Sequence, residues 1–337
     1  MERFVLGLDL GGTKINAAVL DDAGNLISGA RNKTEAELGA ESVLERIVQT
    51  GAKALEGAGI TPNHLYAVGI GSPGPLDWRT GVIIESAHLN FDHFPLGPRL
   101  AERFGRPVFV DNDVNAGTYG EFKKGAARGA SHVLGMFVGT GIGGGIVVKG
   151  ELYHGFSKNA GEVGHMVVLA GGPRCNCGSR GCLESLASRT AIVRDLRKAV
   201  KDGRKTSLTK QHGKRLEEVS SGDLKEAYQH EDKLVQKTIK RAAKYIGIGI
   251  GSLVNVLGPE VVVLGGGVIE ALADEMLPLI ERSAARVAFK FSMKGVRIVR
   301  AELGDDAGVI GAAIIASERF ESQGRRQQPE AASEAGR

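Results

Sequence analysis

One histidine and all three cysteines of the chain lie close together, between positions 165 and 182. Three thiolates and one imidazole are a common ligand set of structural zinc, and the glycines and proline between them favour a tight loop. The candidate ligands are His165, Cys175, Cys177 and Cys182. Four protein ligands would close the coordination sphere, which makes a structural zinc and not a catalytic one. The alternative is three reduced cysteines beside a core histidine, and the one-residue Cys175–Cys177 spacing is mildly irregular for zinc.

Two carboxylates flank this cysteine-rich segment. Glu162 lies shortly before His165, and Glu184 lies shortly after Cys182. Carboxylates in these places could accept hydrogen bonds from the hydroxyl groups of a sugar. The alternative for both residues is plain surface charge.

Two glycine-rich turns each lie between apolar segments that read as strands. The first spans residues 9–14 (DLGGTK) and the second spans residues 139–145 (GTGIGGG). Glycines let backbone N–H groups approach an anion closely, which predicts phosphate binding at both turns. The alternatives are an ordinary hairpin for the first turn and a flexible loop for the second. The candidate nucleotide-binding residues in these turns are Asp9, Gly11, Gly12, Thr13, Lys14, Gly139, Thr140, Gly141 and Gly143.

The more familiar phosphate-binding motifs do not describe these turns. The first turn lacks the spacing of a Walker A loop. The second turn is followed by a strand-like run, whereas a dinucleotide-binding motif would continue into a helix. Asp9 lies where a carboxylate could hold Mg²⁺ through water.

Three consecutive polar residues, Asp111, Asn112 and Asp113, follow a predicted strand. Open α/β sheets bind ligands at the carboxyl ends of their strands. Asp113 could accept the proton of a sugar hydroxyl that attacks phosphorus, and Asn112 could fix neighbouring hydroxyls. The alternative is that these residues cap a helix over residues 114–124.

Two weaker signals are also glycine turns at strand ends. Residues 71–75 (GSPGP) form a rigid turn whose Gly74 could bring backbone against a sugar. Residues 265–267 (GGG) precede a helix, and Gly266 could let an adenosine approach. An ordinary packing-driven turn explains either segment equally well.

The elements that must position these residues form an α/β pattern. Helices are predicted over residues 40–55, 114–124 and 307–319, and mainly helical structure is predicted over 190–257. The charged middle of that region, 199–232, is expected to be a solvated helical segment. Strands are predicted over residues 4–8, 15–20, 66–71, 107–111, 132–138, 144–149 and 261–264.

Two domains are expected, each presenting one glycine turn to a shared cleft. The predicted small N-terminal domain comprises residues 1–114 plus 305–320, and the larger domain comprises 115–304 with the zinc knuckle at 165–182. The tail over 321–337 contains no large apolar residue and is expected to be disordered.

Composition bounds the partners and the compartment. Lysine and arginine number 43 against 39 aspartates and glutamates, so no nucleic-acid partner is expected. No apolar run is long enough for a signal peptide or a membrane span, which predicts no membrane partner. An odd, clustered set of cysteines argues against disulfides, so we expect a cytoplasmic protein.

Taken together, these segments resemble the ROK family of sugar kinases and repressors, and within it the bacterial glucokinases. The resemblance covers roughly residues 4–318, and the cysteine knuckle combined with Glu-x-Gly-His is its most specific part. The matching segments lie in family order at residues 9–14, 71–74, 112–113 with 120–121, 139–144, 161–165, 175–184 and 263–267.

The resemblance implies an actin-like (ribonuclease H-like) two-domain α/β fold with ATP and Mg²⁺ in the interdomain cleft. It implies phosphorylation of a hexose 6-hydroxyl, with glucose as the first expectation and Asp113 as the base. It implies that His165 binds zinc through one ring nitrogen and faces the sugar with the other. Homodimers or homotetramers are implied as well. The implied sugar contacts are Asn112, Asp113, Glu162, His165 and Glu184.

Several alternatives stay open at this point. A kinase for N-acetylmannosamine, N-acetylglucosamine or fructose would use nearly the same polar contacts. A sugar-sensing protein without catalysis is a second class, although Asp113 and both glycine turns argue against it. Family repressors carry an N-terminal helix-turn-helix, and a first strand at about residue 4 leaves no room for one. The donor could be ATP or polyphosphate, although no extended basic groove is indicated.

Overall fold

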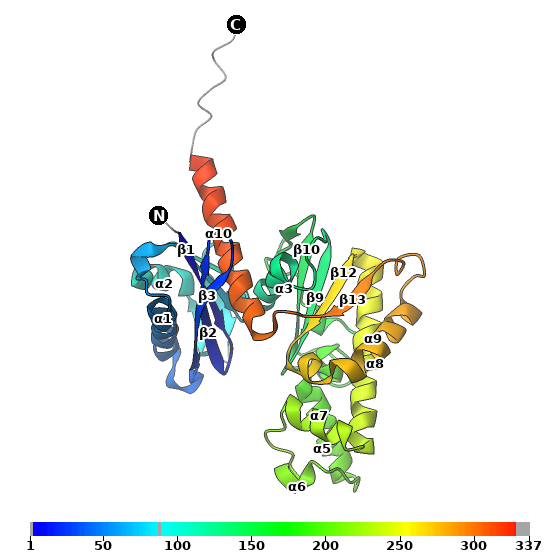
Figure 1. Ribbon diagram of the computed structural model, residues 1–337. Coiled ribbons are helices and arrows are strands. Elements are labelled where there is room, and N and C mark those ends of the chain that lie inside the picture. The colour runs from blue at the N-terminus through cyan, green and yellow to red at the C-terminus, as the bar shows by residue number, and fades with distance from the viewer. Residues whose placement is uncertain (1–2, 87–88, 328–337) are drawn as a thin grey trace. The chain divides into compact units, whose positions relative to one another are not determined.

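The computed structural model describes residues 3–86 and 89–327 (Figure 1). The chain divides into two compact units. The first unit comprises Met1–Lys123, Gly155–Asn159 and Asp305–Arg337, and the second comprises Lys124–His154 and Ala160–Gly304. The short segment 155–159 joins the first unit through two contacts: Lys158 Nζ pairs with Asp77 at 2.5 Å, and Asn159 Oδ1 accepts a hydrogen bond from Leu76 N.

The first unit is built on a five-stranded sheet of order β3-β2-β1-β4-β8. Strand β1 runs antiparallel to β2 and parallel to β4, which in turn runs parallel to β8. These strands are β1 (Phe4–Leu10), β2 (Lys14–Asp21), β3 (Leu26–Lys33), β4 (Leu65–Ser72) and β8 (Val108–Asn112). Four of them match the predicted strands. Strand β3 was not predicted, because none of its residues is buried and all after Leu26 and Ile27 are polar or small.

Helices cover both faces of this sheet. Helices α1 (Ala40–Gly57) and α2 (Leu96–Phe104) lie on one face, and α10 (Ala307–Gln327) lies on the other (Figure 1). The apolar stripe of α1 is buried as its 3.6-residue period predicts. Helix α3 (Asp113–Lys124) follows β8 directly. A small antiparallel sheet of β5 (Leu76–Asp77), β6 (Val82–Ser86) and β7 (Phe91–Phe94) was not predicted.

The second unit repeats the same strand order. Its sheet runs β11-β10-β9-β12-β13, in which β9 is antiparallel to β10 and parallel to β12. The strands are β9 (Val133–Val138), β10 (Ile142–Val148), β11 (Glu151–Leu152), β12 (Val261–Gly265) and β13 (Arg297–Arg300). The helices are α4 (Glu184–Ala187), α5 (Arg189–Lys201), α6 (Thr209–His212), α7 (Ser221–Gln229), α8 (Lys233–Leu257) and α9 (Gly267–Val287).

The charged region 199–232 is less solvated than the sequence suggested. Between its charges it carries apolar side chains that belong to the core of the second unit, and their spacing fits neither a regular helix nor a strand. The buried members are Leu208, Leu216, Val219, Leu224 and Ala227.

The expected disorder of 321–337 is wrong for its first part, because α10 continues through Gln327. Glu321 and Arg325, one helical turn apart, pair at 3.8 Å, and such pairs support an exposed helix that buries no apolar face. Residues 328–337 lie outside the described part of the chain. Among the helices that the structure describes, none is long and apolar enough to cross a membrane.

A partly buried network of hydrogen bonds around Asp232 allows a prediction about stability. Asp232 caps α8, since its Oδ1 accepts hydrogen bonds from Leu234 N and Val235 N at 3.0 and 3.1 Å. Its Oδ2 accepts from the Thr206 hydroxyl at 2.7 Å and from Ser207 N at 2.6 Å. Burial by itself would raise the pKa of Asp232, but these hydrogen bonds outweigh it and hold the pKa below its ordinary value.

We expect Asp232→Ala to lower the free energy of unfolding by about 1–2 kcal/mol at pH 7, the usual worth of such a cap. Asp232→Asn keeps a capping oxygen and should lose less. A depressed pKa stabilises the fold above the ordinary pKa of an aspartate and stops doing so as the pH falls below it. Urea denaturation should therefore show the gap between wild type and Asp232→Asn closing from pH 7 to acid. An equal gap at both pH values would contradict this assignment.

Candidate active site

The first glycine turn lies between β1 and β2, as predicted. Gly11 N donates to Lys14 O at 2.9 Å, which closes the turn. Thr34 holds the turn from β3's end, because its hydroxyl donates to Gly11 O at 2.7 Å and its N–H to Thr13 O at 3.0 Å. Lys14 Nζ pairs with Asp305 Oδ1 at 2.7 Å, so this cation is already balanced by a carboxylate.

The strands that lead into three candidate segments of the first unit are paired with one another near their carboxyl ends. Asp9 on β1 pairs with Gly71 on β4, and Gly71 pairs with Asp111 on β8. Because the three strands are parallel, their carboxyl ends lie at the same edge, and the residues that follow them must lie there too. The structure therefore brings the first glycine turn, the turn at 71–75 and the Asn112–Asp113 pair together within this unit.

The corner between β8 and α3 gives Asn112 a capping role. Its Oδ1 accepts hydrogen bonds from Val114 N at 2.9 Å and Asn115 N at 3.1 Å, and Asp113 Oδ1 also accepts from Val114 N at 2.9 Å. Helix capping, the alternative weighed from sequence, is thus real for Asn112. This cap uses only the side-chain oxygen of Asn112. The amide nitrogen, Nδ2, lies on the side of Gly74, 4.0 Å from the position that a Cβ on that glycine would take.

Two carboxylates interact at this edge. Burial and, next in size, the charge of Asp113 raise the pKa of Asp9 to about 7, while a 3.4 Å hydrogen bond from Asn16 Nδ2 opposes the shift. Two carboxylates that repel one another in a partly buried place are stabilised by a cation between them or nearby. The donor chemistry at Asp9 therefore suits a hard cation such as Mg²⁺.

In the second unit the other glycine turn joins β9 to β10. Gly139 N donates to Gly141 O at 2.9 Å, and Gly143 lies within β10, opposite Phe137. Two residues that follow the cysteine segment donate hydrogen bonds to Thr140 of this turn. Arg189 Nη2 donates to Thr140 Oγ1 and Thr190 Oγ1 donates to Thr140 O, both at 2.8 Å.

Glu184 also contacts this turn. Its Oε2 accepts a hydrogen bond from Ile142 N at 3.0 Å, and a Cβ on Gly141 would lie 2.5 Å from the same oxygen. Gly266 is required by the fold itself, because its φ of 83° and a Cβ only 2.7 Å from the Val138 backbone exclude a side chain. β12 and β9 are parallel, so Gly266 and Gly139 follow the same edge of the second sheet.

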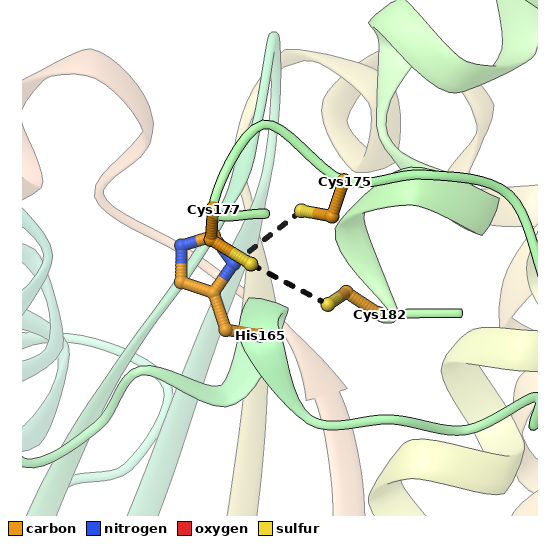
Figure 2. Close-up of side chains that lie close together, drawn as sticks. All are labelled: His165, Cys175, Cys177 and Cys182. Atoms are coloured by element: carbon orange, nitrogen blue, oxygen red, sulfur yellow. Dashed lines mark hydrogen bonds between the residues drawn. The ribbon is translucent and has the colours of Figure 1, made fainter. Parts of the chain in front are cut away.

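The histidine and the three cysteines converge in the second unit (Figure 2). One ligand atom from each residue lies within 4.8 Å of all the others. His165 Nδ1 is 3.6 Å from Cys175 Sγ, and Cys177 Sγ is 3.7 Å from Cys182 Sγ. Tetrahedral zinc with bonds of about 2.3 Å to sulfur separates two ligand atoms by about 3.8 Å, so the residues fit the metal.

The thiols of this cluster differ in character. A backbone hydrogen bond from Ser179, followed by the neighbouring Cys175, lowers the pKa of Cys177 to about 7, whereas burial raises the pKa of Cys182. On the outer side of the cluster, His165 Nε2 faces Glu162 Oε2 at 3.9 Å, and Glu184 Oε1 lies 4.0 Å from Cys175 Sγ. Both flanking carboxylates predicted from sequence therefore lie against the cluster.

Four residues of the site had no signal in the sequence. Arg189 and Thr190 hold the second turn, and Thr34 and Asp305 hold the first. They belong to none of the glycine or cysteine motifs. Only the position of Arg189 and Thr190, directly after the cysteine segment, offered a hint.

Both sheets have the strand order of the actin-like two-domain fold. Comparison with known proteins agrees with this fold. Residues 5–319 match the model of the ROK family, and the chain belongs to this family.

A glucokinase from Halalkalibacterium halodurans is 34% identical over 98% of this chain and 99% of its own length. The structure of a ROK hexokinase from Thermus thermophilus is 38% identical, with a TM-score of 0.80 over 95% of this chain and 99% of that one. A ROK family glucokinase from Streptomyces griseus, solved with glucose and AMPPNP, is 31% identical, with a TM-score of 0.81 over 94% and 99% of the two chains.

Gly12 and Gly139, one in each glycine turn, have room for a larger side chain, which allows a test of phosphate binding. Neither Gly12 nor Gly139 has a left-handed φ, and no atom lies within 4 Å of an added Cβ at either position. The fold alone would accept alanine there, so a glycine points to a ligand that needs the space.

We expect Gly12→Ala and Gly139→Ala to keep the wild-type melting temperature within about 2 °C, since surface changes usually cost little, and to raise the KM for nucleotide. Gly266→Ala is the contrasting variant, because its Cβ meets backbone, and it should melt at a lower temperature. Thermal unfolding and steady-state kinetics measure both effects. An unchanged KM in both turn variants would argue against phosphate binding there.

Proposed function

We propose that the protein transfers the γ-phosphoryl group of ATP to the 6-hydroxyl of a hexose, with glucose as the first candidate. The observation that carries this proposal is the row of Asp9, Gly71 and Asp111 across three parallel strands. The first glycine turn follows the strand of Asp9, and Asp113 follows the strand of Asp111, so the turn and this carboxylate lie at the same edge of the sheet. The glucokinase and hexokinase relatives, one of them solved with glucose and AMPPNP, support the same reaction.

In the proposed mechanism Asp113 is the general base. Its carboxylate takes the proton of the 6-hydroxyl while that oxygen forms a bond to the γ-phosphorus. The bond from the γ-phosphorus to the bridging oxygen breaks, and ADP leaves with the electron pair. The proposed sugar contacts are Gly74, Asn112, Asp113, Glu162, His165 and Glu184.

The nucleotide would lie against the glycine turns. Backbone N–H groups of residues 11–13 and 139–141 would bind phosphate oxygens, and Gly266 would face the adenosine. Mg²⁺ bound with ATP would neutralise phosphate charge. Asp9 would hold the ion through water, and a divalent charge there would oppose the burial and the Asp113 charge that raise the pKa of this carboxyl. The proposed nucleotide-binding residues are Asp9, Gly11, Gly12, Thr13, Lys14, Gly139, Thr140, Gly141, Gly143 and Gly266.

Zinc held by His165, Cys175, Cys177 and Cys182 would be structural. All four positions of a tetrahedral ion would be filled by protein, so it offers no open site for chemistry. With Nδ1 towards the cysteines, the Nε2 of His165 stays free to face a sugar hydroxyl beside Glu162. The metal would therefore fix the orientation of a sugar-binding side chain.

Two other functions use the same scaffold. An amino-sugar or fructose kinase would keep these contacts and differ in the space near the sugar 2-position. A sugar sensor without catalysis is disfavoured because it would need neither Asp113 nor open phosphate turns. Reduced thiolates are also typical of cytoplasmic proteins, which is the compartment that we expect.

We also expect a homodimer or homotetramer. The exposed apolar side chains of Val256, Phe289 and Phe291 are consistent with a subunit interface, and light scattering would measure the oligomeric state.

The central test is a kinase assay over a panel of hexoses with MgATP, coupled to ADP release. We expect turnover with glucose, and Asp113→Asn should keep sugar binding but lose about 100-fold or more in kcat, as loss of a general base does. Asp92→Asn, at an exposed carboxylate, is the matched control. No turnover with any hexose would overturn the kinase assignment, and a normal rate in Asp113→Asn would remove Asp113 as the base.

Elemental analysis tests the metal directly. We expect about one zinc per chain, as a four-ligand site holds. Cys177→Ser should lose the zinc and melt at a lower temperature. Glu162→Gln lies outside the ligand set and should retain the metal while raising the KM for sugar. Wild-type protein free of zinc after purification without chelators would favour the reduced-cysteine alternative.

A further inference from the structure

A buried ion pair lies directly behind the corner that presents Asn112 and Asp113. Arg319 of α10 pairs through Nη2 with Asp111 Oδ2, and its Nη1 donates to Val110 O at 3.0 Å. The Asp111 side chain is 2% exposed and that of Arg319 is 18% exposed. One side chain of α10 thus contacts both a side chain and the main chain at the carboxyl end of β8.

The second oxygen of Asp111 acts on the corner itself. Asp111 Oδ1 accepts hydrogen bonds from Asn112 N and from Asn115 Nδ2, both at 2.9 Å. Asn112 in turn caps α3 through Val114 N and Asn115 N. An unbroken series of polar contacts therefore runs from Arg319 through Asp111 to the backbone N–H of Asn112 and, through the Asn112 side chain, to the first turn of α3, where Asp113 lies.

The only tryptophan of the chain orients the guanidinium. The guanidinium carbon of Arg319 lies 4.5 Å from the centre of the Trp78 ring, a cation–π distance. Trp78 follows Asp77 of β5, which is paired with Lys158. A planar guanidinium can stack on an aromatic ring while it donates to two acceptors in fixed directions, whereas a lysine ammonium has donors but no planar group to stack.

Stability alone is a weak reason for such an arrangement. Removing two charges from water costs several kcal/mol, and a well-packed apolar pair of similar volume is often as stable or more stable. A buried ion pair does, however, restrict a backbone corner to one geometry. This one restricts the corner that carries the proposed base.

We propose that Arg319 is a positioning residue for phosphoryl transfer, acting through Asp111 to hold Asn112 and Asp113 in the reactive geometry. The proposal rests on the proposed function of Asp113. Removal of the guanidinium takes the positive charge away from the buried Asp111 carboxylate and the donor away from Val110 O, so α10 no longer holds this corner. Misplacement of a catalytic group by about 1 Å can cost about 100-fold in rate.

The test compares Arg319→Met and Arg319→Lys with Glu318→Gln. Glu318 precedes Arg319 on α10 and pairs with Lys123 and Tyr119 of α3 at 2.7 and 2.5 Å, away from Asp111. We expect Arg319→Met to lower kcat by about 10- to 100-fold, the range of a displaced catalytic group, with the KM for ATP within twofold. Arg319→Lys keeps the positive charge, so its kcat should lie between those of Arg319→Met and wild type. Glu318→Gln should keep the wild-type kcat.

A lowered kcat with an unchanged KM for ATP is the result that a merely structural role would not produce, and Trp78 emission adds a report on the contact with Arg319 itself. We expect glucose to change the emission of wild type and Glu318→Gln but not of Arg319→Met, because the corner no longer transmits binding to the ring. If Arg319→Met does not fold, Arg319→Lys carries the same comparison. Arg319 variants with a lower melting temperature and unchanged kcat would overturn the proposal. A normal kcat in Asp113→Asn would instead overturn the base assignment, so the two failures are distinguishable.

Discussion

Parallel pairing of the central strands is the constraint on which the rest of the structure depends. In the first unit β1, β4 and β8 are parallel, and in the second unit β9 and β12 are parallel. Parallel strands end at the same edge of a sheet, so the residues that follow them are neighbours however far apart they are in sequence. A hairpin added at the first strand of each set brings a glycine turn to that same edge. Each unit thereby gathers its ligand-binding segments by topology, before any side chain contributes.

Side chains then hold these edges from behind. In the second unit the segment that ends the cysteine cluster continues into Glu184, Arg189 and Thr190, all of which contact the glycine turn. The cluster and the turn are thus parts of one short stretch of packed chain. A metal that closes the cluster would stiffen the glycine turn as well, since Glu184 contacts both Cys175 of the cluster and Ile142 at the end of the turn. Its influence would extend to the nucleotide without any direct bond to it.

The sequence predicted what local signals can encode. Buried strands, both glycine turns and the cysteine cluster follow from residue types at short spacing. Strand β3 was missed because its exposed face carries few apolar residues, and the helical extension to Gln327 was missed because it depends on helix propensity and charge pairs and buries no apolar face. Lys14 to Asp305 and Asp111 to Arg319 join residues about 200 or more positions apart. Such pairs exist only once the chain has folded, so no motif announces them.

The polar groups at the two edges explain phosphoryl transfer better than they explain the choice of sugar. Carboxylates, an amide and an imidazole recognise hydroxyls, and every hexose offers several. A site can discriminate between sugars in two ways. A polar group of the protein can lose its hydrogen bond when the wrong sugar binds, or the packing of side chains can exclude the extra atoms of that sugar. Glu162 and the Nε2 of His165, which face each other at 3.9 Å, would supply the first by sharing one sugar hydroxyl, because a sugar without that hydroxyl would leave both without that hydrogen bond. An N-acetyl group keeps the other hydroxyls and adds bulk, so only shape can reject it. Any preference for glucose over amino sugars would therefore have to come from packing near the 2-position and not from the proposed acid–base residues.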